Sequence, residues 1–191
     1  MTYRTSNFKL EQIHGKAPDS TSGEALLRNY IFGVRLLRIN HTQNKKTYIR
    51  IIGYEVPIYS RGQHRDECID LLGYDEQYQP WIVELKQEKA SDSLGEVVAQ
   101  VTRYAEAFDN GIGQAVQEEV RERLLWPSFS FKGKAKRMIL ASRTFFIGRN
   151  ETPKNSKDIL FCSFSRIKDE ASLMNSSRDE IGLKIERLTR A

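Results

Sequence analysis

The sequence has few of the features that mark secreted or membrane-spanning proteins. Only two of its 191 residues are cysteine, Cys68 and Cys162, so it offers neither a disulfide framework nor a metal-ligand spacing. No apolar run approaches the roughly 18 residues that a membrane-spanning helix needs. The N-terminal stretch MTYRTSNFKLEQIHG lacks the apolar core of a signal peptide. These absences favour a cytoplasmic protein with no membrane segment.

The composition that remains is that of an ordinary folded protein. Hydrophobic residues make up 39% of the chain and charged residues 29%, which is typical of globular rather than disordered proteins. The length is enough for one domain with a sizeable core. We therefore expect a single domain over residues 1–191, with a core at about 20–147 and C-terminal strands at 158–188 of unassigned role.

The charge is distributed unevenly along the chain. Residues 1–65 carry a net charge of +7, residues 66–125 carry −9, and residues 126–191 carry +7. Basic flanks around an acidic middle suit a protein whose flanks attract a polyanion and whose acidic residues hold metal ions. A solvated surface with uneven charge explains the same numbers equally well.

The hydrophobic pattern predicts one sheet flanked by helices. Cap residues and helical spacing of apolar positions predict helices over about 22–37, 91–111 and 115–126. Runs of β-branched and aromatic residues predict strands over 46–59, 67–74, 80–86, 136–148, 157–167 and 182–189. The polar segment between the second and third strands predicts a hairpin turn.

Two carboxylates interrupt this hairpin at matching positions. Asp70 and Glu84 are equidistant from Gln77, so in a symmetric hairpin they are cross-strand partners with Cβ atoms about 5 Å apart. Two like charges placed so close are destabilising unless a cation lies between them, and hard divalent cations prefer carboxylate oxygens. Lys86 projects from the same face, where it can hold a water or a phosphate charge.

Two other interpretations of the hairpin compete with a metal site. Glu84 and Lys86 could be an ordinary ion pair on a solvated face, and a bulge in the turn would separate the two carboxylates. However, the strand over 80–86 is apolar on both faces, which is typical of a buried strand. Buried charges are rare unless they are paired or bound to metal, so the functional interpretation is favoured.

The arrangement of these residues resembles the PD-(D/E)XK nuclease superfamily, whose members have the restriction-endonuclease-like fold. The matching elements are Asp70, the hairpin, Glu84-Leu85-Lys86, and a following helix that carries Gln100 and Tyr104. The segments IDLLGYD, PWIVELK and QVTRY are similar to the group with an ID, ELK and Q-x-x-x-Y pattern. That group includes nuclease domains of mismatch and branched-DNA endonucleases. The resemblance is sharp over about residues 66–104.

The resemblance implies a fold, a metal site and a reaction. The fold would be α/β (α+β), a mixed central sheet with a three-stranded meander flanked by helices. Mg²⁺ or Mn²⁺ would be bound by Asp70, Glu84 and the main-chain carbonyl of Leu85. Lys86 would orient or deprotonate the attacking water, and DNA would be cut to leave a 5′-phosphate. The alternative function is a non-catalytic nucleic-acid-binding or scaffold protein that kept this fold, and a homodimer is also left open.

Further residues are weaker candidates for the same site. Many relatives carry a Glu on the first helix that faces the metal, and Glu24 is the candidate here; Glu55 is a second. Glu24 also fits a capping box with Thr21, in which it would only close the helix start. Gln100 and Tyr104 share a helix face and in the resembled group lie beside the active site, although Tyr104 also suits the helix core.

Basic residues in loops and on the second helix are candidates for phosphate contacts. The segment FSFKGKAKR interleaves Phe129 and Phe131 with cations, which suits a stacking platform for single-stranded nucleic acid. It also suits a plain strand-loop-strand surface, which is slightly favoured. The predicted nucleic-acid-binding residues are Arg65, Arg103, Lys132, Lys134, Lys136 and Arg137.

Overall fold

The computed structural model describes residues 23–41, 46–58, 67–87, 90–147, 159–166 and 183–187. Helices and strands combine in a mixed α/β arrangement. In chain order the elements are α2 (Gly23–Val34), β1 (Leu36–Asn40), β2 (Lys46–Pro57), β3 (Cys68–Tyr74), β4 (Pro80–Lys86), α3 (Leu94–Ala107), η1 (Phe108–Ile112), α4 (Gly113–Arg123), β5 (Lys136–Ser142), α5 (Arg143–Ile147), β6 (Ile159–Arg166) and β7 (Leu183–Arg187).

The strands form one mixed sheet that closes on itself. β1 to β4 pair in sequence order and antiparallel, so the expected meander of β2, β3 and β4 is confirmed. β4, β5 and β6 pair in parallel, and β7 pairs antiparallel with β6. β7 also pairs in parallel with β1, which closes the sheet.

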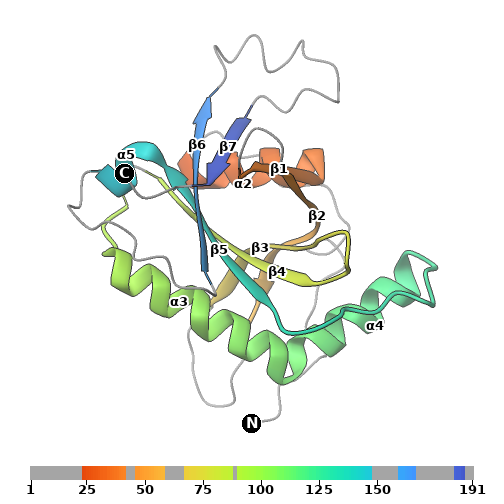
Figure 1. Cartoon of the computed structure of the whole chain (residues 1–191). Helices are drawn as coiled ribbons and strands as arrows, with labels where there is room; N and C mark the ends of the chain where they lie inside the picture. The colour runs from red at the N-terminus through yellow and green to blue at the C-terminus, as the bar shows by residue number, and fades with distance from the viewer. Residues whose placement is uncertain are drawn as a thin grey trace.

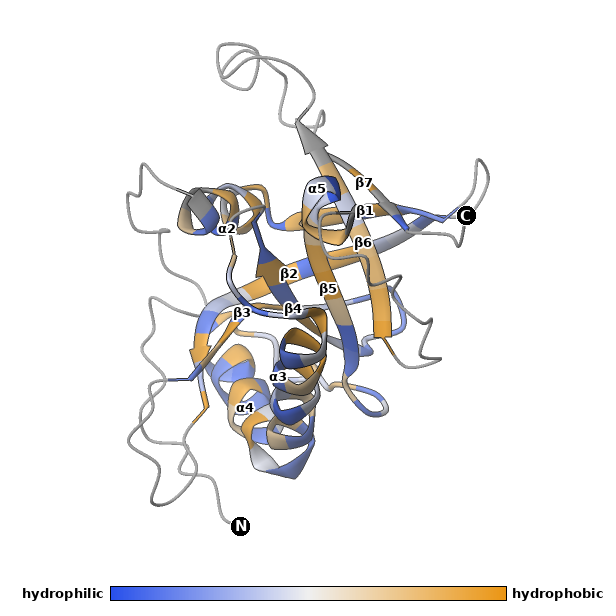
Figure 2. Ribbon diagram, turned by 90° about the vertical axis from the view of Figure 1, so that its left-hand side faces the viewer, coloured by the Kyte–Doolittle hydropathy of each residue, from blue (hydrophilic) through white to orange (hydrophobic). Residues whose placement is uncertain are grey.

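Helices cover the sheet from two sides (Figure 1). α3 and α4 pack with one hydrophobic cluster that includes Ile82, Val97 and Phe129. α2 packs with a second cluster on the other side of the strands, which includes Phe32, Val83 and Leu140. Figure 2 shows apolar residues along β6 and much of β5. Every residue of β4 is buried, as the apolar character of both its faces predicts.

The helix over 91–111 forms for the reasons that its sequence indicates. The Ser93 side chain accepts a hydrogen bond from the Glu96 N–H, and the Glu96 carboxylate accepts one from the Ser93 N–H, which is a complete capping box. Leu94, Val97 and Val101 are buried on its inner face. Gly111, at φ 140°, adopts a conformation that only glycine tolerates well, and it separates α3 from α4.

Two of the predicted boundaries are wrong. The first helix ends at Val34 rather than near residue 37, because Arg35 takes a left-handed conformation (φ 64°) and the chain then enters β1. The strand predicted over 136–148 ends at Ser142, whose Oγ accepts a hydrogen bond from the Phe145 N–H at 3.2 Å and starts the short helix α5.

No helix in the described part of the chain has both the length and the apolar character needed to cross a membrane.

Candidate active site

The β3–β4 hairpin has the register that the sequence predicts. It pairs Leu71 with Val83 and Leu72 with Ile82, symmetric about Gln77 and with no shift within the described strands. One further step, beyond the last pair of this ladder, would set Asp70 opposite Glu84. The register therefore excludes the alternative in which a bulge moves the two carboxylates apart.

Glu84 is a buried carboxylate with one oxygen unsatisfied. Its side chain is only 2% exposed, and its Oε1 lies 3.0 Å from Lys86 Nζ. Its Oε2 is buried with no hydrogen-bond partner in the described part of the chain. Burial, followed by the charge of Asp70, raises the pKa of Glu84 well above its usual value. In this environment the ionised carboxylate requires a cation.

Asp70 is held by contacts from two elements. Its Oδ2 accepts a hydrogen bond from the Leu85 N–H at 2.8 Å, and its Oδ1 lies 3.7 Å from Arg28 NH1. Burial raises the pKa of Asp70, and the Leu85 N–H and the charges of Lys86 and Arg28 only partly oppose this. Both carboxylates of the hairpin thus resist ionisation, as expected of like charges buried together.

Lys86 is the cation nearest to Glu84. Its ammonium lies 3.0 Å from Glu84 Oε1 and 3.1 Å from Asp92 Oδ2. Burial alone would lower the pKa of Lys86, but the neighbouring carboxylates, Glu84 first, outweigh it and raise the pKa. Lys86 is therefore held as an ammonium.

Glu24, in the first turn of α2, is electrostatically part of the same cluster. Burial first, and the charge of Asp70 second, raise its pKa. This environment favours the metal-facing interpretation of Glu24, while Thr21, its partner in the proposed capping box, lies outside the described residues. Glu55, the second candidate, instead pairs with Arg28 at 2.8 Å.

Gln100 and Tyr104 lie together on α3. Gln100 Nε2 donates a hydrogen bond to the Tyr104 hydroxyl at 2.8 Å. The Tyr104 ring is buried in the core, as the simpler interpretation predicts. Burial raises the pKa of Tyr104 to about 12, and the charges of Glu84 and Asp70 contribute to the shift. Tyr104 therefore belongs both to the core and to the electrostatic surroundings of the hairpin carboxylates.

The predicted phosphate-contacting residues are spread over different parts of the chain. Arg65 is outside the described residues. Arg103 pairs with Glu67 at 3.1 Å. Lys132 lies 5.9 Å from the centre of the Tyr78 ring. Phe129 is fully buried and packs against Trp126 and Phe131, so it cannot stack on a base and the platform interpretation is wrong for it.

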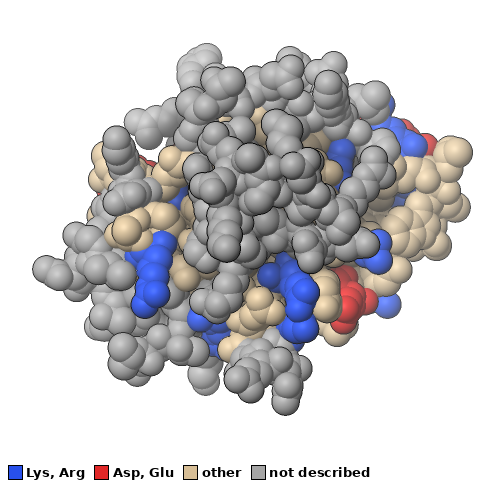
Figure 3. All heavy atoms as spheres, turned by 90° about the horizontal axis from the view of Figure 1, so that it is seen from above, with Lys and Arg blue, Asp and Glu red and all other residues tan. Residues whose placement is uncertain are grey.

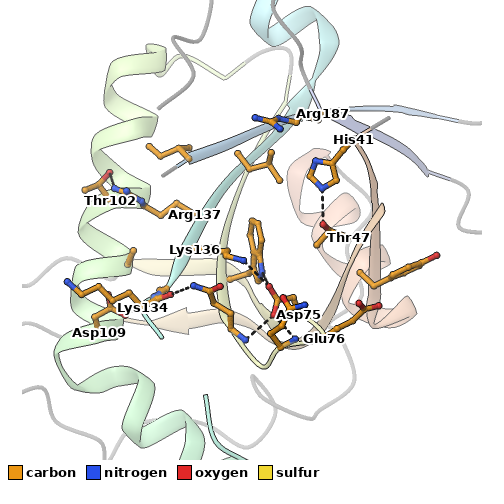
Figure 4. Close-up of a pocket in the computed structure, with 18 of the residues that line it drawn as sticks. His41, Thr47, Asp75, Glu76, Thr102, Asp109, Lys134, Lys136, Arg137 and Arg187 are labelled. Carbon is orange, nitrogen blue, oxygen red and sulfur yellow. Dashed lines mark hydrogen bonds and ion pairs between the residues drawn. The ribbon is translucent and has the colours of Figure 1, made fainter. Parts of the chain in front are cut away.

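The other basic residues of that segment line a cavity of about 1120 Å³ (Figure 4). The cavity lies at the end of β4 where Trp81 is, whereas Lys86 is at the opposite end of that strand. Its wall includes Lys46, Lys134, Lys136, Arg137 and Arg187, from three different strands or their flanks, together with the acidic Asp75, Glu76, Glu106 and Asp109. Lys136 Nζ forms an ion pair with Asp75 Oδ2 at 3.1 Å, and Arg137 NH1 donates a hydrogen bond to Thr102 Oγ1.

Sequence reasoning missed two charged residues that touch the site. Asp92, just before α3, is the second partner of Lys86. Arg28, on α2, bridges Glu55 and Asp70. A signal for Arg28 exists in the sequence, because it follows Glu24 by four residues and so shares its helix face. Nothing in the sequence pairs Arg28 with a strand residue.

The hairpin carboxylates fit a hard divalent cation. The described residues contain no group of three or more His, Cys, Asp or Glu side chains arranged to hold a metal, so the fit rests on two carboxylates and one main-chain oxygen. Glu84 Oε2 is buried and unsatisfied within the described part of the chain. The Leu85 N–H points to Asp70, and in an extended strand the C=O of the same residue points to the same edge.

Comparison with known proteins gives a match to a protein family. The family model for the endonuclease NucS C-terminal domain matches residues 53–162, more than half of the chain. The matched segment contains Asp70, Glu84, Lys86 and the Gln100–Tyr104 pair. No curated protein and no solved structure matches the chain.

Proposed function

The chain belongs to the family of the endonuclease NucS C-terminal domain, and from this premise we propose that it is a metal-dependent nuclease that hydrolyses phosphodiester bonds in DNA. The observation that carries the proposal is the buried carboxylate pair, in which Glu84 Oε2 has no partner in the described part of the chain. Burying such a group is costly unless a cation compensates it. A divalent cation held by two carboxylates can supply the Lewis acid for phosphodiester hydrolysis.

The metal-binding groups would be Asp70, Glu84 and the main-chain carbonyl of Leu85, with Glu24 as the nearest additional carboxylate. Oxygen ligands of this kind suit Mg²⁺ or Mn²⁺. When bound, the ion supplies Lewis-acid polarisation of the phosphate and lowers the pKa of the attacking water. Asp70 is already oriented by the Leu85 N–H at 2.8 Å, which reduces the reorganisation needed on binding.

Lys86 would act as a donor rather than as a base. Glu84 and Asp92 raise its pKa, so the ammonium form predominates in the resting protein. An ammonium can donate hydrogen bonds to the attacking water and stabilise the negative charge that develops on the phosphate. Of the two roles that the resemblance implies, orientation of water and removal of its proton, the raised pKa favours orientation.

Gln100 and Tyr104 would support this site from α3. Gln100 donates to the Tyr104 oxygen, so the hydroxyl proton of Tyr104 points elsewhere. The raised pKa of Tyr104, about 12, keeps that proton in place at neutral pH. The pair would position a water or a phosphate oxygen beside Glu84 and would not itself exchange protons.

We further propose that α2, the β2–β3–β4 meander, α3 and β5 constitute a restriction-endonuclease-like core. The order of these elements supports this, as does the place of the carboxylates at one end of the hairpin. Membership of the more specific group with the ID, ELK and Q-x-x-x-Y pattern is part of the same proposal. DNA is the proposed partner.

A cleavage assay tests the proposal. Single-stranded, duplex, flapped and branched DNA would each be incubated with the protein in Mg²⁺, in Mn²⁺ and in EDTA. We expect cleavage only with metal, and its loss by at least about 10³-fold in Asp70→Asn, Glu84→Gln and Lys86→Gln. Glu119→Gln is a matched control, because Glu119 pairs with Arg123 on α4, outside the proposed site.

Two results would contradict the nuclease proposal. Activity that survives in EDTA, or in the two carboxylate variants, would mean that another site performs the reaction. Tight DNA binding with no cleavage of any substrate in either metal would favour the alternative, a non-catalytic nucleic-acid-binding protein of the same family. Circular dichroism of each variant would establish that loss of activity is not loss of fold.

A further inference from the structure

Arg28 is a cation beside the carboxylate site for which the proposed metal chemistry has no role. It lies on α2, one helical turn after Glu24, and it contacts two strands. Its NH2 lies 2.8 Å from Glu55 Oε1, and its NH1 lies 3.7 Å from Asp70 Oδ1. Its side chain is 13% exposed, so the guanidinium is mostly withdrawn from solvent but still reachable.

The hydrogen-bonding groups of Arg28 are only partly used. A guanidinium carries five N–H donors, and the interaction with Glu55 has the length of a good charge-assisted hydrogen bond. The 3.7 Å separation from Asp70 is too long for a hydrogen bond. The Nε atom is buried with no partner in the described part of the chain. Unsatisfied donors in a buried cation cost free energy. The Nε atom is itself closed to solvent, so an anionic ligand would be bound through NH1, which makes no hydrogen bond to Asp70.

Glu55, which holds the guanidinium, is itself in an unusual conformation. Its φ is 43°, in the left-handed region that a glutamate seldom adopts. Backbone strain of this kind is retained mainly where the surrounding structure and function require it. The strained position aims the Glu55 carboxylate, 41% exposed, at Arg28, and the ion pair then fixes the direction of the remaining donors.

We propose that Arg28 binds a phosphate oxygen of the DNA strand to be cut, and that Glu55 positions its guanidinium for this interaction. The inference rests on the proposed nuclease function, whose metal site is built on Asp70. Once Asp70 binds a cation, its weak interaction with Arg28 is replaced, and NH1 is left facing the centre where the phosphate must lie. The planar fork of arginine matches phosphate oxygens, and Lys86 on β4 would face the same phosphate from the hairpin.

The alternative is that Arg28 only holds Asp70 in place, and the two roles predict opposite effects on metal binding. A phosphate-binding Arg28 adds positive charge beside a cation site, so its removal leaves the affinity for metal unchanged or tighter. An Arg28 that only positions Asp70 supports the ligand, so its removal weakens metal binding. The metal affinity of the DNA-free protein therefore separates the two roles without any measurement of cleavage.

The experiment compares Arg28→Gln, Arg28→Lys and Glu55→Gln with the wild type, and uses Arg123→Gln on α4 as the matched control. Calorimetry with Mn²⁺ alone measures metal affinity. Fluorescence anisotropy of a labelled oligonucleotide in Ca²⁺ measures DNA affinity under conditions of poor turnover. Single-turnover kinetics in Mg²⁺ measure the cleavage step.

For Arg28→Gln we expect Mn²⁺ affinity equal to or above that of the wild type. DNA affinity in Ca²⁺ should fall by about tenfold, and the cleavage rate by about 10²–10³-fold. Arg28→Lys should recover part of the loss, because it keeps the charge but not the fork. Glu55→Gln should show the same pattern more weakly, and Arg123→Gln should match the wild type.

Two outcomes overturn the inference. Mn²⁺ affinity that falls in parallel with the cleavage rate would assign Arg28 to the support of Asp70. Wild-type DNA affinity and cleavage in Arg28→Gln would leave it without a role in the site. If the wild type cuts no DNA, the proposed function fails by itself. The Ca²⁺ binding measurement then still tests Arg28: an unchanged DNA affinity in Arg28→Gln overturns the inference, and a tenfold loss supports it.

Discussion

At the scale of single residues, the main feature is that two neighbouring carboxylates, Asp70 and Glu84, are buried although their negative charges repel each other. Burial and the charge of Asp70 both raise the pKa of Glu84. A carboxylate whose folded-state pKa is raised destabilises the fold when ionised. This loss of folding free energy is complete when the pH is above the folded-state pKa, and it disappears when the pH is below the unfolded-state pKa. Metal-free protein should therefore become more stable as the pH falls from 8 towards 5.

This argument predicts that Glu84→Gln stabilises the metal-free protein. In EDTA at pH 8 its melting temperature should exceed that of the wild type, by about 2–4 °C for each kcal/mol of repulsion removed. The difference should shrink as the pH falls, because the wild-type carboxylate then takes up a proton. Mn²⁺ should raise the melting temperature of the wild type and not that of the variant. Differential scanning calorimetry at several pH values measures all three effects.

Glu119→Gln controls for the loss of any ion-paired glutamate, because Glu119 pairs with Arg123 at the protein surface. A Glu84→Gln variant that melts below the wild type in EDTA would contradict this prediction. The stabilisation from the Lys86–Glu84 ion pair would then exceed the destabilisation from repulsion between the two carboxylates. The site would then be an ordinary buried ion pair, and the argument for a cation at Glu84 Oε2 would fail.

The site could be predicted from sequence only where local geometry determines it. Asp70 and Glu84 meet because both lie on one hairpin, whose register follows from the turn and from strand alternation. Arg28 could not be found in this way, because its interactions with Glu55 and Asp70 depend on how α2 packs against β2 and β3. Helix packing joins residues far apart in the chain, and the apolar period of a helix does not indicate which strand residues its side chains will contact.

At the scale of elements, the β3–β4 turn is organised by one buried side chain. Asp75, 5% exposed, accepts hydrogen bonds from the main-chain N–H groups of Gln77 and Gln79, from Trp81 Nε1 and from Lys136 Nζ. Burial alone would raise the pKa of Asp75, but these hydrogen bonds outweigh it and lower the pKa. The hydrogen bonds fix the turn, and thereby the register that sets Asp70 opposite Glu84.

We expect Asp75→Asn to destabilise the fold by about 1–3 kcal/mol at pH 7, since a charge-assisted acceptor of several donors is weakened. The pKa of the native carboxylate is lowered, so its stabilisation is present above the unfolded-state value and is lost as the pH falls through the folded-state value. The difference between wild type and variant should therefore narrow below about pH 4. Urea denaturation at pH 7 and pH 3.5 measures it, with Glu76→Gln in the same turn as control. A difference independent of pH would contradict a role for the charge.

Elements with strong local signals could be predicted, and those fixed by single backbone conformations could not. α3 follows from its capping box and its buried stripe, and β4 from an apolar run on both faces. The sequence does not predict β1, because the helix before it ends at Arg35, which takes a left-handed backbone conformation. The Arg35 guanidinium lies 3.5 Å from the centre of the Phe32 ring. The closure of the sheet by β1 and β7 joins strands at opposite ends of the chain, which no local pattern indicates.

At the scale of the whole molecule, the carboxylate site and the basic cavity lie towards opposite ends of β4. β4 contributes a residue to each of them: Trp81 lines the cavity, and Lys86 pairs with Glu84 in the carboxylate site. Five residues of extended strand span about 16 Å, close to the length of five base pairs of DNA. The cavity brings together Lys134 and Arg137 with Arg187, fifty residues further along the chain (Figure 4). Seen from above, Lys and Arg side chains are also exposed at several separate places (Figure 3).

This arrangement predicts that the cavity binds phosphates away from the cut position. Charge reversal of Lys134 and Arg187 to Glu should weaken DNA binding for all sequences about equally, because phosphate contacts carry no sequence information. On duplex DNA, the slope of log K against log salt should become shallower by about 0.9 for each phosphate that the variant no longer neutralises. Cleavage at saturating DNA should be unchanged, because neither reversed residue belongs to the proposed metal site. Lys136 is left intact, since it pairs with Asp75.

Fluorescence anisotropy over a range of salt concentrations makes the measurement, and Arg123→Glu on α4 is the control for net charge. Equal losses of affinity in the cavity variants and in this control would mean that DNA responds only to the total charge of the protein. An affinity that is independent of salt in the wild type would exclude the cavity as a phosphate-binding surface. DNA would then be held by the residues around Asp70 and Glu84 alone, and the basic flanks of the sequence would have no part in recognition.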